Sequence, residues 1–311
     1  MKTTSQYCIE QYGEKLYKLS LNGGMTCPNR DGTCGTGGCI FCSEGGSGDF
    51  APSALLPLDR QIALAKERVK GKYKGSRYIA YFQAFTNTHA PASRLKELFL
   101  PVLQRDDIAV LSIATRPDCL PDEVMELLEQ LNRIKPLWVE LGMQTANEDT
   151  ARLINRCYPL AVYDSAVARL NAAGIHVITH VILGLPGETE QDMLASVRHA
   201  VQAGSGGIKL QLLHVLEGTV LAGMYRRGEF RTLEMDEYLS ILGRCLDELP
   251  EDTVVHRLTG DGPKKLLIAP LWSADKKQVI NAVRRMLEEK DGQRRRKDQR
   301  DAPSGSEEDS V

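Results

Sequence analysis

The stretch 175-IHVITHVILGLPGETEQDMLASVRHAVQAG-204 contains a strand-like run, a loop and a helical pattern in immediate succession. Residues 175–183 are almost continuously apolar and rich in β-branched side chains, which is typical of a parallel strand covered on both faces. Apolar residues then recur at helical spacing over 193–201, and Thr189 with Asp192 forms a capping box at the start of that helix. The stretch therefore predicts one complete strand-loop-helix unit.

The same kind of unit recurs along the chain. Five further strand-like runs, separated by helical patterns, lie at 16–21, 78–83, 108–114, 137–144 and 208–213. Six such strands with helices between them predict an α/β fold with a parallel sheet, either open or curved into a partial or full barrel. The spacing of apolar residues does not choose between these forms.

The segment after the sixth strand has a different character. Helices are expected around 234–249 and 275–289, flanking a connector, and they would complete or cover the open side of the sheet. Residues 290–311 are charged and lack apolar periodicity, so we expect a disordered tail.

Composition narrows the functional classes. The chain has 311 residues, 42% of them hydrophobic, and a formal net charge of -2, which gives no general attraction to nucleic acid. No apolar run approaches the roughly 20 residues of a membrane span, and the first residues lack the apolar core of a signal peptide. We therefore expect a cytoplasmic protein with no membrane association.

Four of the eight cysteines lie within the sequence 27-CPNRDGTCGTGGCIFC-42, which indicates a metal site more than a disulfide framework. Cys27, Cys39 and Cys42 could hold an iron-sulfur cluster and leave one iron without a protein ligand. With Cys34 added, the four could instead form a closed tetrahedral zinc site. The aromatic Phe41 beside the last cysteine, and the position of the loop directly after the first of the six strands, favour the three-cysteine cluster.

Polar side chains on the predicted strands are the second chemical signal. An unpaired buried polar atom costs about 1 to 3 kcal/mol, so such residues need a reason to be there. Strand alternation places Glu140 and Gln144 on one face, His176 and His180 on one face, and Lys209 on a face with Gln211. Several of these lie toward the carboxyl ends of the strands, where barrel enzymes place their sites; for His176 we favour a packing role.

The order of the motifs resembles that of a known family. Its matching segments are CPNRDGTCGTGGCIFC, YFQAFTNT, IATRPDCLP, WVELGMQT, HVILGLPGET, GIKLQLLHVL and TGDGPKKLLIAPLW. They resemble radical S-adenosylmethionine (SAM) enzymes of the YhcC/YtqA type, which are akin to the Elongator catalytic subunit and to oxygen-independent coproporphyrinogen oxidase. The resemblance implies a partial (β/α)6 barrel over 13–215, with a C-terminal helical extension over 216–289 that completes the domain.

The resemblance also implies the cofactors. A [4Fe-4S] cluster would be bound by Cys27, Cys39 and Cys42, with Cys34 a non-ligand inside an eleven-residue spacing that is longer than the common three. SAM would chelate the open iron, and an electron from a donor such as flavodoxin or ferredoxin would cleave it to a 5'-deoxyadenosyl radical.

Residues expected to contact SAM follow from the same resemblance. Gln144 and Arg156 would hold the ribose and the methionine carboxylate, and His180 would face the ribose. The backbone of Gly184–Gly187 would approach the adenine. Further candidates in or beside the matching segments are Gln83, Thr86, Asn87, Thr115 and Glu140. Two positions depart from the family pattern, because Ala114 replaces an acid and His180 stands where an aspartate is common.

The substrate is left more open. Lys264 and Lys265 follow a Gly-Asp-Gly-Pro turn that would suit a phosphate, although a solvated basic turn explains them equally well. The resemblance implies a tRNA-modifying enzyme acting on the C5 side chain of wobble uridine. A small-molecule substrate and a non-catalytic zinc-stabilised scaffold are the alternatives.

Overall fold

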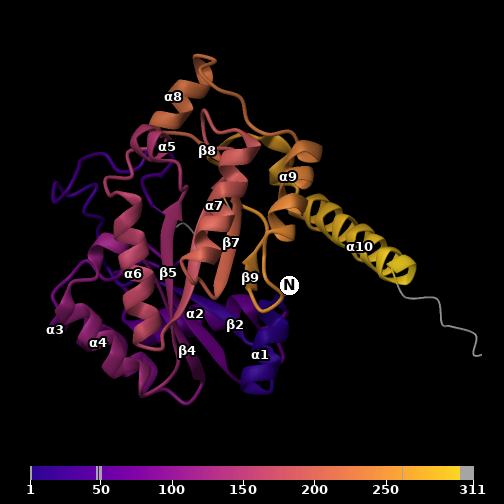
Figure 1. Ribbon diagram of the computed structural model, residues 1–311. Coiled ribbons are helices and arrows are strands. Elements are labelled where there is room, and N and C mark those ends of the chain that lie inside the picture. The colour runs from indigo at the N-terminus through magenta and orange to yellow at the C-terminus, as the bar shows by residue number, and fades with distance from the viewer. Residues whose placement is uncertain (1, 47, 49–50, 261, 302–311) are drawn as a thin grey trace, which may run out of the picture.

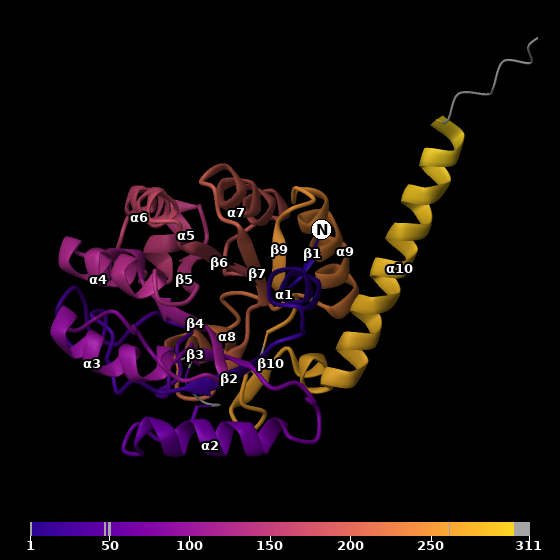
Figure 2. The same ribbon diagram turned by 90° about the horizontal axis from the view of Figure 1, so that it is seen from below.

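The computed structural model describes residues 2–46, 48, 51–260 and 262–301, without the side chains of 293–301. Its main element is an eight-stranded parallel sheet in the order β1-β9-β7-β6-β5-β4-β3-β2. Seen from below in Figure 2, the strands follow a curve instead of a flat layer. The fold is thus the expected α/β partial barrel. The strands are β1 (Lys2–Thr3), β2 (Tyr17–Leu21), β3 (Tyr78–Phe82), β4 (Ile108–Thr115), β5 (Leu137–Gln144), β6 (His176–Leu183), β7 (Gly207–Leu212) and β9 (Val254–Arg257).

The helices lie mainly on the convex side of this sheet (Figures 1 and 2). Their bounds are α1 (Thr4–Tyr12), α2 (Leu58–Val69), α3 (Ala92–Leu103), α4 (Asp122–Asn132), α5 (Glu148–Leu153), α6 (Leu160–Ala172), α7 (Glu190–Gln202), α8 (Val220–Arg226), α9 (Met235–Asp247) and α10 (Lys276–Asp301). The capping box of Thr189 and Asp192 starts α7 as the sequence predicts. None of the helices in the described residues is both long and apolar enough to cross a membrane.

The six predicted strands are β2 to β7, and the sheet extends beyond them. Strand β9 pairs with β7 on one side and with β1 on the other, although it belongs to the segment after residue 215. A second, antiparallel pair joins β8 (Val215–Leu216) to β10 (Leu267–Ala269). The extension therefore supplies part of the sheet itself, and a boundary at residue 215 does not divide the fold into separate layers.

The C-terminal tail differs from expectation. Helix α10 continues to Asp301, so the backbone of residues 290–301 is helical where the sequence analysis expected disorder; residues 302–311 lie outside the described residues. Lysine, arginine and glutamine dominate this segment and are good helix formers, which explains how a chain without apolar periodicity continues a helix that has already begun. The helix projects from the body in Figure 2.

An aromatic cluster fills the end of the half-barrel opposite the carboxyl ends of the strands. The ring of His176 stacks on Tyr7 of α1 at 5.4 Å between centroids, and Trp138 meets His256 edge-on at 5.2 Å. Within the described part of the chain, Nε2 of His176 and both ring nitrogens of His256 have no hydrogen-bond partner. The packing role favoured for His176 agrees with this environment.

Burial should make the stability of this cluster depend on pH. Desolvation, with Lys18 nearby, lowers the pKa of His176 from 6.5 to about 4, and burial also places the pKa of His256 well below its ordinary value. Between pH 6.5 and 4 the unfolded chain therefore binds protons that the folded chain does not, so stability is lost as the pH falls through this window.

We predict that His176→Gln flattens this dependence. The free energy of unfolding, measured by urea denaturation under anaerobic conditions, should fall for the wild type as the pH drops from 6.5 to 5, by up to about 1.4 kcal/mol per pH unit for each such imidazole. The free energy of unfolding of the variant should fall less over the same range. Above pH 7.5 the difference in this free energy between the variant and the wild type should not depend on pH. Parallel curves over the whole range would contradict the assignment.

Candidate functional site

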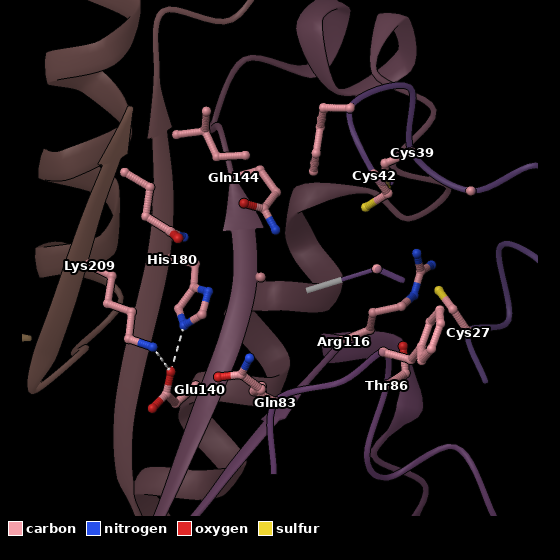
Figure 3. Close-up of a pocket in the computed structure, with 18 of the residues that line it drawn as sticks. Cys27, Cys39, Cys42, Gln83, Thr86, Arg116, Glu140, Gln144, His180 and Lys209 are labelled. Carbon is pink, nitrogen blue, oxygen red and sulfur yellow. Dashed lines mark hydrogen bonds and ion pairs between the residues drawn. The ribbon is translucent and has the colours of Figure 1, made fainter. Parts of the chain in front are cut away.

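A cavity of about 280 Å³ opens at the carboxyl ends of the strands. Figure 3 shows its two ends: Cys27, Cys39 and Cys42 lie on one side, and Glu140 with Lys209 lies on the other. The cysteines come from the loop after β2, whereas the charged residues come from the strands themselves. The structure therefore brings together two groups that the sequence places about a hundred residues apart.

The cysteine loop is held by a turn that follows α5. The Asn155 side chain donates a hydrogen bond to the Gly38 carbonyl at 2.9 Å, and the Asn29 side chain donates to the Asn155 carbonyl at 2.5 Å. A glycine-rich loop has little structure of its own, so these contacts supply the order that its sequence lacks. Neither asparagine was singled out by the sequence analysis, and both belong to loops without any periodic signal.

Arg30 supports the same loop from within it. Its guanidinium donates to the carbonyls of Cys42, Ser43 and Glu44 at 3.2, 2.5 and 3.1 Å. A hydrogen bond from Cys39 lowers the pKa of Cys42 against the effect of burial, and Arg30 acts in the same direction. These two contacts stabilise negative charge on the Cys42 sulfur relative to a thiol that is buried without them.

Cys34 stands apart from the other three cysteines of the loop. It is exposed, it is not part of the cavity lining, and its sulfur accepts a contact from Arg116 Nη2 at 3.6 Å. In the described segments no three or more Cys, His, Asp or Glu side chains are close enough to hold a metal ion. Cys27, Cys39 and Cys42 line the cavity together, whereas Cys34 lies outside its lining.

Glu140 is the centre of the opposite wall. Its carboxylate, which is fully buried, accepts from Lys18 Nζ at 2.6 Å, from Ser112 Oγ at 2.7 Å and from His180 Nε2 at 2.8 Å, and it also pairs with Lys209. Burial alone would raise the pKa of Glu140, but the two lysines and His180 hold it well below its usual range. The carboxylate is therefore ionised at neutral pH.

Burial also shifts the pKa values of the groups around Glu140. Desolvation lowers the pKa of His180 to about 4, and neighbouring Lys209 contributes, so the imidazole is neutral and donates from Nε2 to the carboxylate. Burial lowers the pKa of Lys209, and the adjacent Glu140 carboxylate opposes that shift, whereas Lys18 and Arg257 add to it. Shifts of this kind, in residues that line a cavity, are typical of functional sites.

Three of the predicted SAM contacts face the cavity in positions suited to a ligand. Gln83 and Thr115 line it, Gln83 accepting from Ser20 Oγ at 3.1 Å and Thr115 sharing a 2.5 Å hydrogen bond with Thr88. Gln144 Oε1 is buried and has no hydrogen-bond partner among the described atoms. In Figure 3 this side chain points into the space between the cysteines and His180. A buried acceptor without a donor fits a ligand that brings one.

Arg156 lines the cavity, yet its guanidinium is committed to the protein. It donates to the carbonyls of Met143, Thr145 and Tyr158 at 3.1, 2.7 and 3.0 Å and pairs with Glu148 at 3.2 Å. Its evident role is to fix the chain after β5 and the turn after α5. The sequence could not show this, because carbonyl partners leave no pattern in side-chain type.

Two other predicted regions lie away from the cavity. Gly184 and the following residues to Gly187 line a separate hollow beside α7 and α9, although Ile182 of the same strand reaches the main cavity. Lys264 and Lys265 are exposed and do not line the main cavity, whereas Gly262 and Pro263 of their turn do.

Several lining or neighbouring residues were missed. They are Lys18, Arg30, Tyr81 and Tyr158. Lys18 carried a detectable signal, because alternation along β2 places a lysine on the same face as Ser20. Tyr158 carried none, since it lies in a loop and donates its hydroxyl to the Gly142 carbonyl.

Comparison with known proteins settles the family. The model of the radical SAM superfamily matches residues 30–200, and that of the radical SAM C-terminal domain matches residues 206–289. The chain belongs to the radical SAM superfamily. Proteins of this family use a [4Fe-4S] cluster and SAM, and both are therefore cofactors of this chain.

Similar sequences span most of the chain. YtqA of Bacillus subtilis, described as uncharacterized, is 46% identical over 286 residues, which cover 92% of this chain and 89% of YtqA. Protein YhcC of Escherichia coli is 35% identical over 280 residues, covering 90% and 89%. A tRNA uridine(34) acetyltransferase of Methanocaldococcus infernus is 26% identical over 162 residues, covering 51% of this chain and 30% of that protein.

A solved structure supports the fold. Elp3 of Methanocaldococcus infernus superposes with a TM-score of 0.62 over 81% of this chain and 58% of that chain, at 17% sequence identity. This identity is low, so the likeness concerns the architecture of the half-barrel alone.

We predict that Cys34→Ala retains its iron after anaerobic reconstitution, because Cys34 lies outside the cavity. Cys39→Ala should lose most of it, because that thiol lines the cavity. The iron content and the visible absorbance of the cluster are measured for both variants. Loss of iron from Cys34→Ala to the level of Cys39→Ala would show that Cys34 is a ligand.

We also predict that Glu140→Gln destabilises the protein strongly. Removing one partner leaves the ammonium groups of Lys18 and Lys209 without their counter-charge, which costs on the order of 3 kcal/mol in a buried pair. Urea denaturation provides the measurement, with Glu97→Gln as control, because Glu97 forms an exposed ion pair with Arg94 and its loss should cost about 1 kcal/mol or less. Equal losses in the two variants would contradict the central role of Glu140.

Proposed function

We propose that this protein is a radical SAM enzyme that modifies the C5 side chain of the wobble uridine of a tRNA. The observation that carries the chemistry is the cavity itself, which is lined by three thiols of one loop and by Gln144, whose buried Oε1 has no donor among the residues that the structure describes. In this proposal Cys27, Cys39 and Cys42 hold the [4Fe-4S] cluster. The bound cluster and SAM together supply a 5'-deoxyadenosyl radical when an electron is delivered.

The chain's own residues position the reactants and keep water out. Gln144, on β5, would accept a hydrogen bond from the bound SAM. Thr115 on the adjacent strand β4 and Gln83, which follows β3, offer further oxygens. Tyr81 and Tyr158 also line the cavity, and the Tyr81 ring lies beside the ammonium groups of Lys18 and Lys209, at 4.7 and 4.6 Å from its centroid. Side chains on rigid strands hold a reactive centre at a fixed distance and orientation to its target atom more accurately than side chains on loops do.

Arg116 is a better candidate than Arg156 for binding the methionine carboxylate of SAM. Its side chain lines the cavity, and its partners are the Asp118 carboxylate at 2.6 Å and the Cys34 sulfur. A guanidinium offers up to five donors, so one edge can remain directed to a ligand while the other is held by Asp118. Arg156, with its donors on backbone carbonyls, maintains the turn beside it.

The tRNA substrate rests on the similarity to a protein whose name states an activity on a tRNA uridine. This tRNA uridine(34) acetyltransferase shares sequence over half of this chain. We further propose a flavodoxin or ferredoxin as the electron donor and the cytoplasm as the location, where tRNA is found. A small-molecule substrate is the competing proposal and would leave tRNA unchanged.

Two measurements test the proposal. Anaerobically reconstituted protein with dithionite should release 5'-deoxyadenosine from SAM, and Cys39→Ala should not. The nucleosides of tRNA from a strain lacking the gene should then show an altered wobble uridine, restored by the wild-type gene and not by the Cys39→Ala gene. SAM cleavage with unchanged wobble uridines would exclude tRNA, and absence of cleavage would exclude the enzyme.

A further inference from the structure

Two thiols that the proposed chemistry does not use lie together at the edge of the site. Cys34 belongs to the cysteine loop and Cys157 to the turn after α5, and both are exposed. Each of the two thiols is close enough to influence the pKa of the other, and the Arg116 guanidinium acts electrostatically on both. A Cβ built on Gly35 would lie 3.2 Å from Cys157 Sγ, so the turn is packed against the residue next to Cys34.

The turn holds Cys157 in an unusual conformation. Asn155 and Cys157 have positive φ angles of 56° and 66°, which residues with side chains rarely adopt. The Cys157 sulfur lies 3.1 Å from Asn29 Oδ1 in the cysteine loop. Backbone strain of this kind persists only where surrounding contacts enforce it, and here the contacts are those that seat the cysteine loop.

The remaining cysteines are unsuited to the same role. Cys8, Cys119 and Cys245 are buried and distributed over other parts of the fold, and Cys27, Cys39 and Cys42 line the cavity. Cys34 and Cys157 are therefore the two thiols that a small reagent in solution can reach while the site stays assembled.

We propose that Cys34 and Cys157 form a reversible disulfide when the protein meets a low-molecular-weight disulfide, and that this bond fastens the cysteine loop to the turn after α5. The Cys34–Cys157 bond would add a covalent link to the Asn29–Asn155 contacts and would restrict opening of the loop that carries the proposed cluster ligands. In a reducing compartment such bonds are transient and act in redox response.

The chemistry balances with glutathione disulfide as oxidant. One cysteine thiolate attacks the disulfide, forming a mixed disulfide and releasing one glutathione thiolate, which takes up a proton. The second cysteine then attacks the protein sulfur of the mixed disulfide, forming the Cys34–Cys157 bond and releasing the second glutathione. The protein loses two electrons and two protons, and glutathione disulfide is reduced to two glutathione molecules.

Burial raises the pKa of both thiols, so the reaction should be followed at pH 8, where more thiolate is present. Cluster-loaded protein is incubated anaerobically with glutathione disulfide, its free thiols are alkylated, and tryptic peptides are analysed by mass spectrometry. We expect the peptide 157–169 to be linked to the peptide that contains Cys34, with the bond located at Cys34 by fragmentation. Reduction should release both peptides, and Cys34→Ser and Cys157→Ser should not give the product.

Iron retention measures the consequence. Oxidised wild-type protein should lose iron to a chelator several-fold more slowly than reduced wild-type protein, whereas Cys157→Ser should lose it at the same rate after either treatment. No linked peptide, or a bond from Cys157 to Cys39 or Cys42, would overturn the proposed pair. The expected bond without any change in iron loss would overturn its effect on the loop.

The effect on iron rests on the proposed function, whereas the disulfide does not. The two can fail separately: release of 5'-deoxyadenosine by reduced protein tests the enzyme, and the linked peptide tests the thiol pair. Cys34→Ser and Cys157→Ser should both release 5'-deoxyadenosine at the rate of reduced wild type, because neither thiol lines the cavity.

Discussion

A single buried carboxylate connects most of the half-barrel. Glu140 on β5 accepts from Lys18 on β2, Ser112 on β4 and His180 on β6, and it pairs with Lys209 on β7. A carboxylate without partners could not be held ionised in this environment, because desolvation of a lone charge costs far more than the fold can supply. The strands must therefore keep their relative positions for the charge to be tolerated, and the concave face becomes a rigid polar wall.

The opposite end of the cavity is built on another principle. The cysteine loop has four glycines and no periodic apolar pattern between Cys27 and Cys42, and it is ordered by hydrogen bonds from Arg30, Asn29 and Asn155. The bonds between Asn29 and Asn155 and between Asn155 and Gly38 join the loop to a turn more than a hundred residues later in the chain. The rigid wall thus fixes where a substrate can lie, whereas the sulfur end depends on contacts between two loops.

Much of the fold could be predicted from the sequence, because six strands are apolar enough to be recognised individually. Strands β1 and β9 could not, since two and four residues carry too little periodicity to be recognised. Alternation placed Glu140 on a face but did not identify Lys18 as its partner, which depends on how the sheet curves. Arg156 was expected to bind a ligand, and the structure shows its donors on carbonyl groups, a kind of contact that residue types do not reveal.

The C-terminal extension supplies part of the cavity wall, and this part bears on which substrate the cavity accepts. Arg257 on β9, together with Gly260, Gly262 and Pro263 of the following turn, lines the cavity on the side away from the cysteines. The central strands β2 to β7 carry the Glu140 network, which cannot change at one position without loss at the others. Arg257 acts electrostatically on Lys209 and His180 of that network, whereas the turn after β9 carries no partner of Glu140 among the described residues, so this turn can vary while the half-barrel is kept. If family members differ in substrate, the physical constraints therefore place the differences in the turn after β9, and leave the sulfur end and Glu140 unchanged.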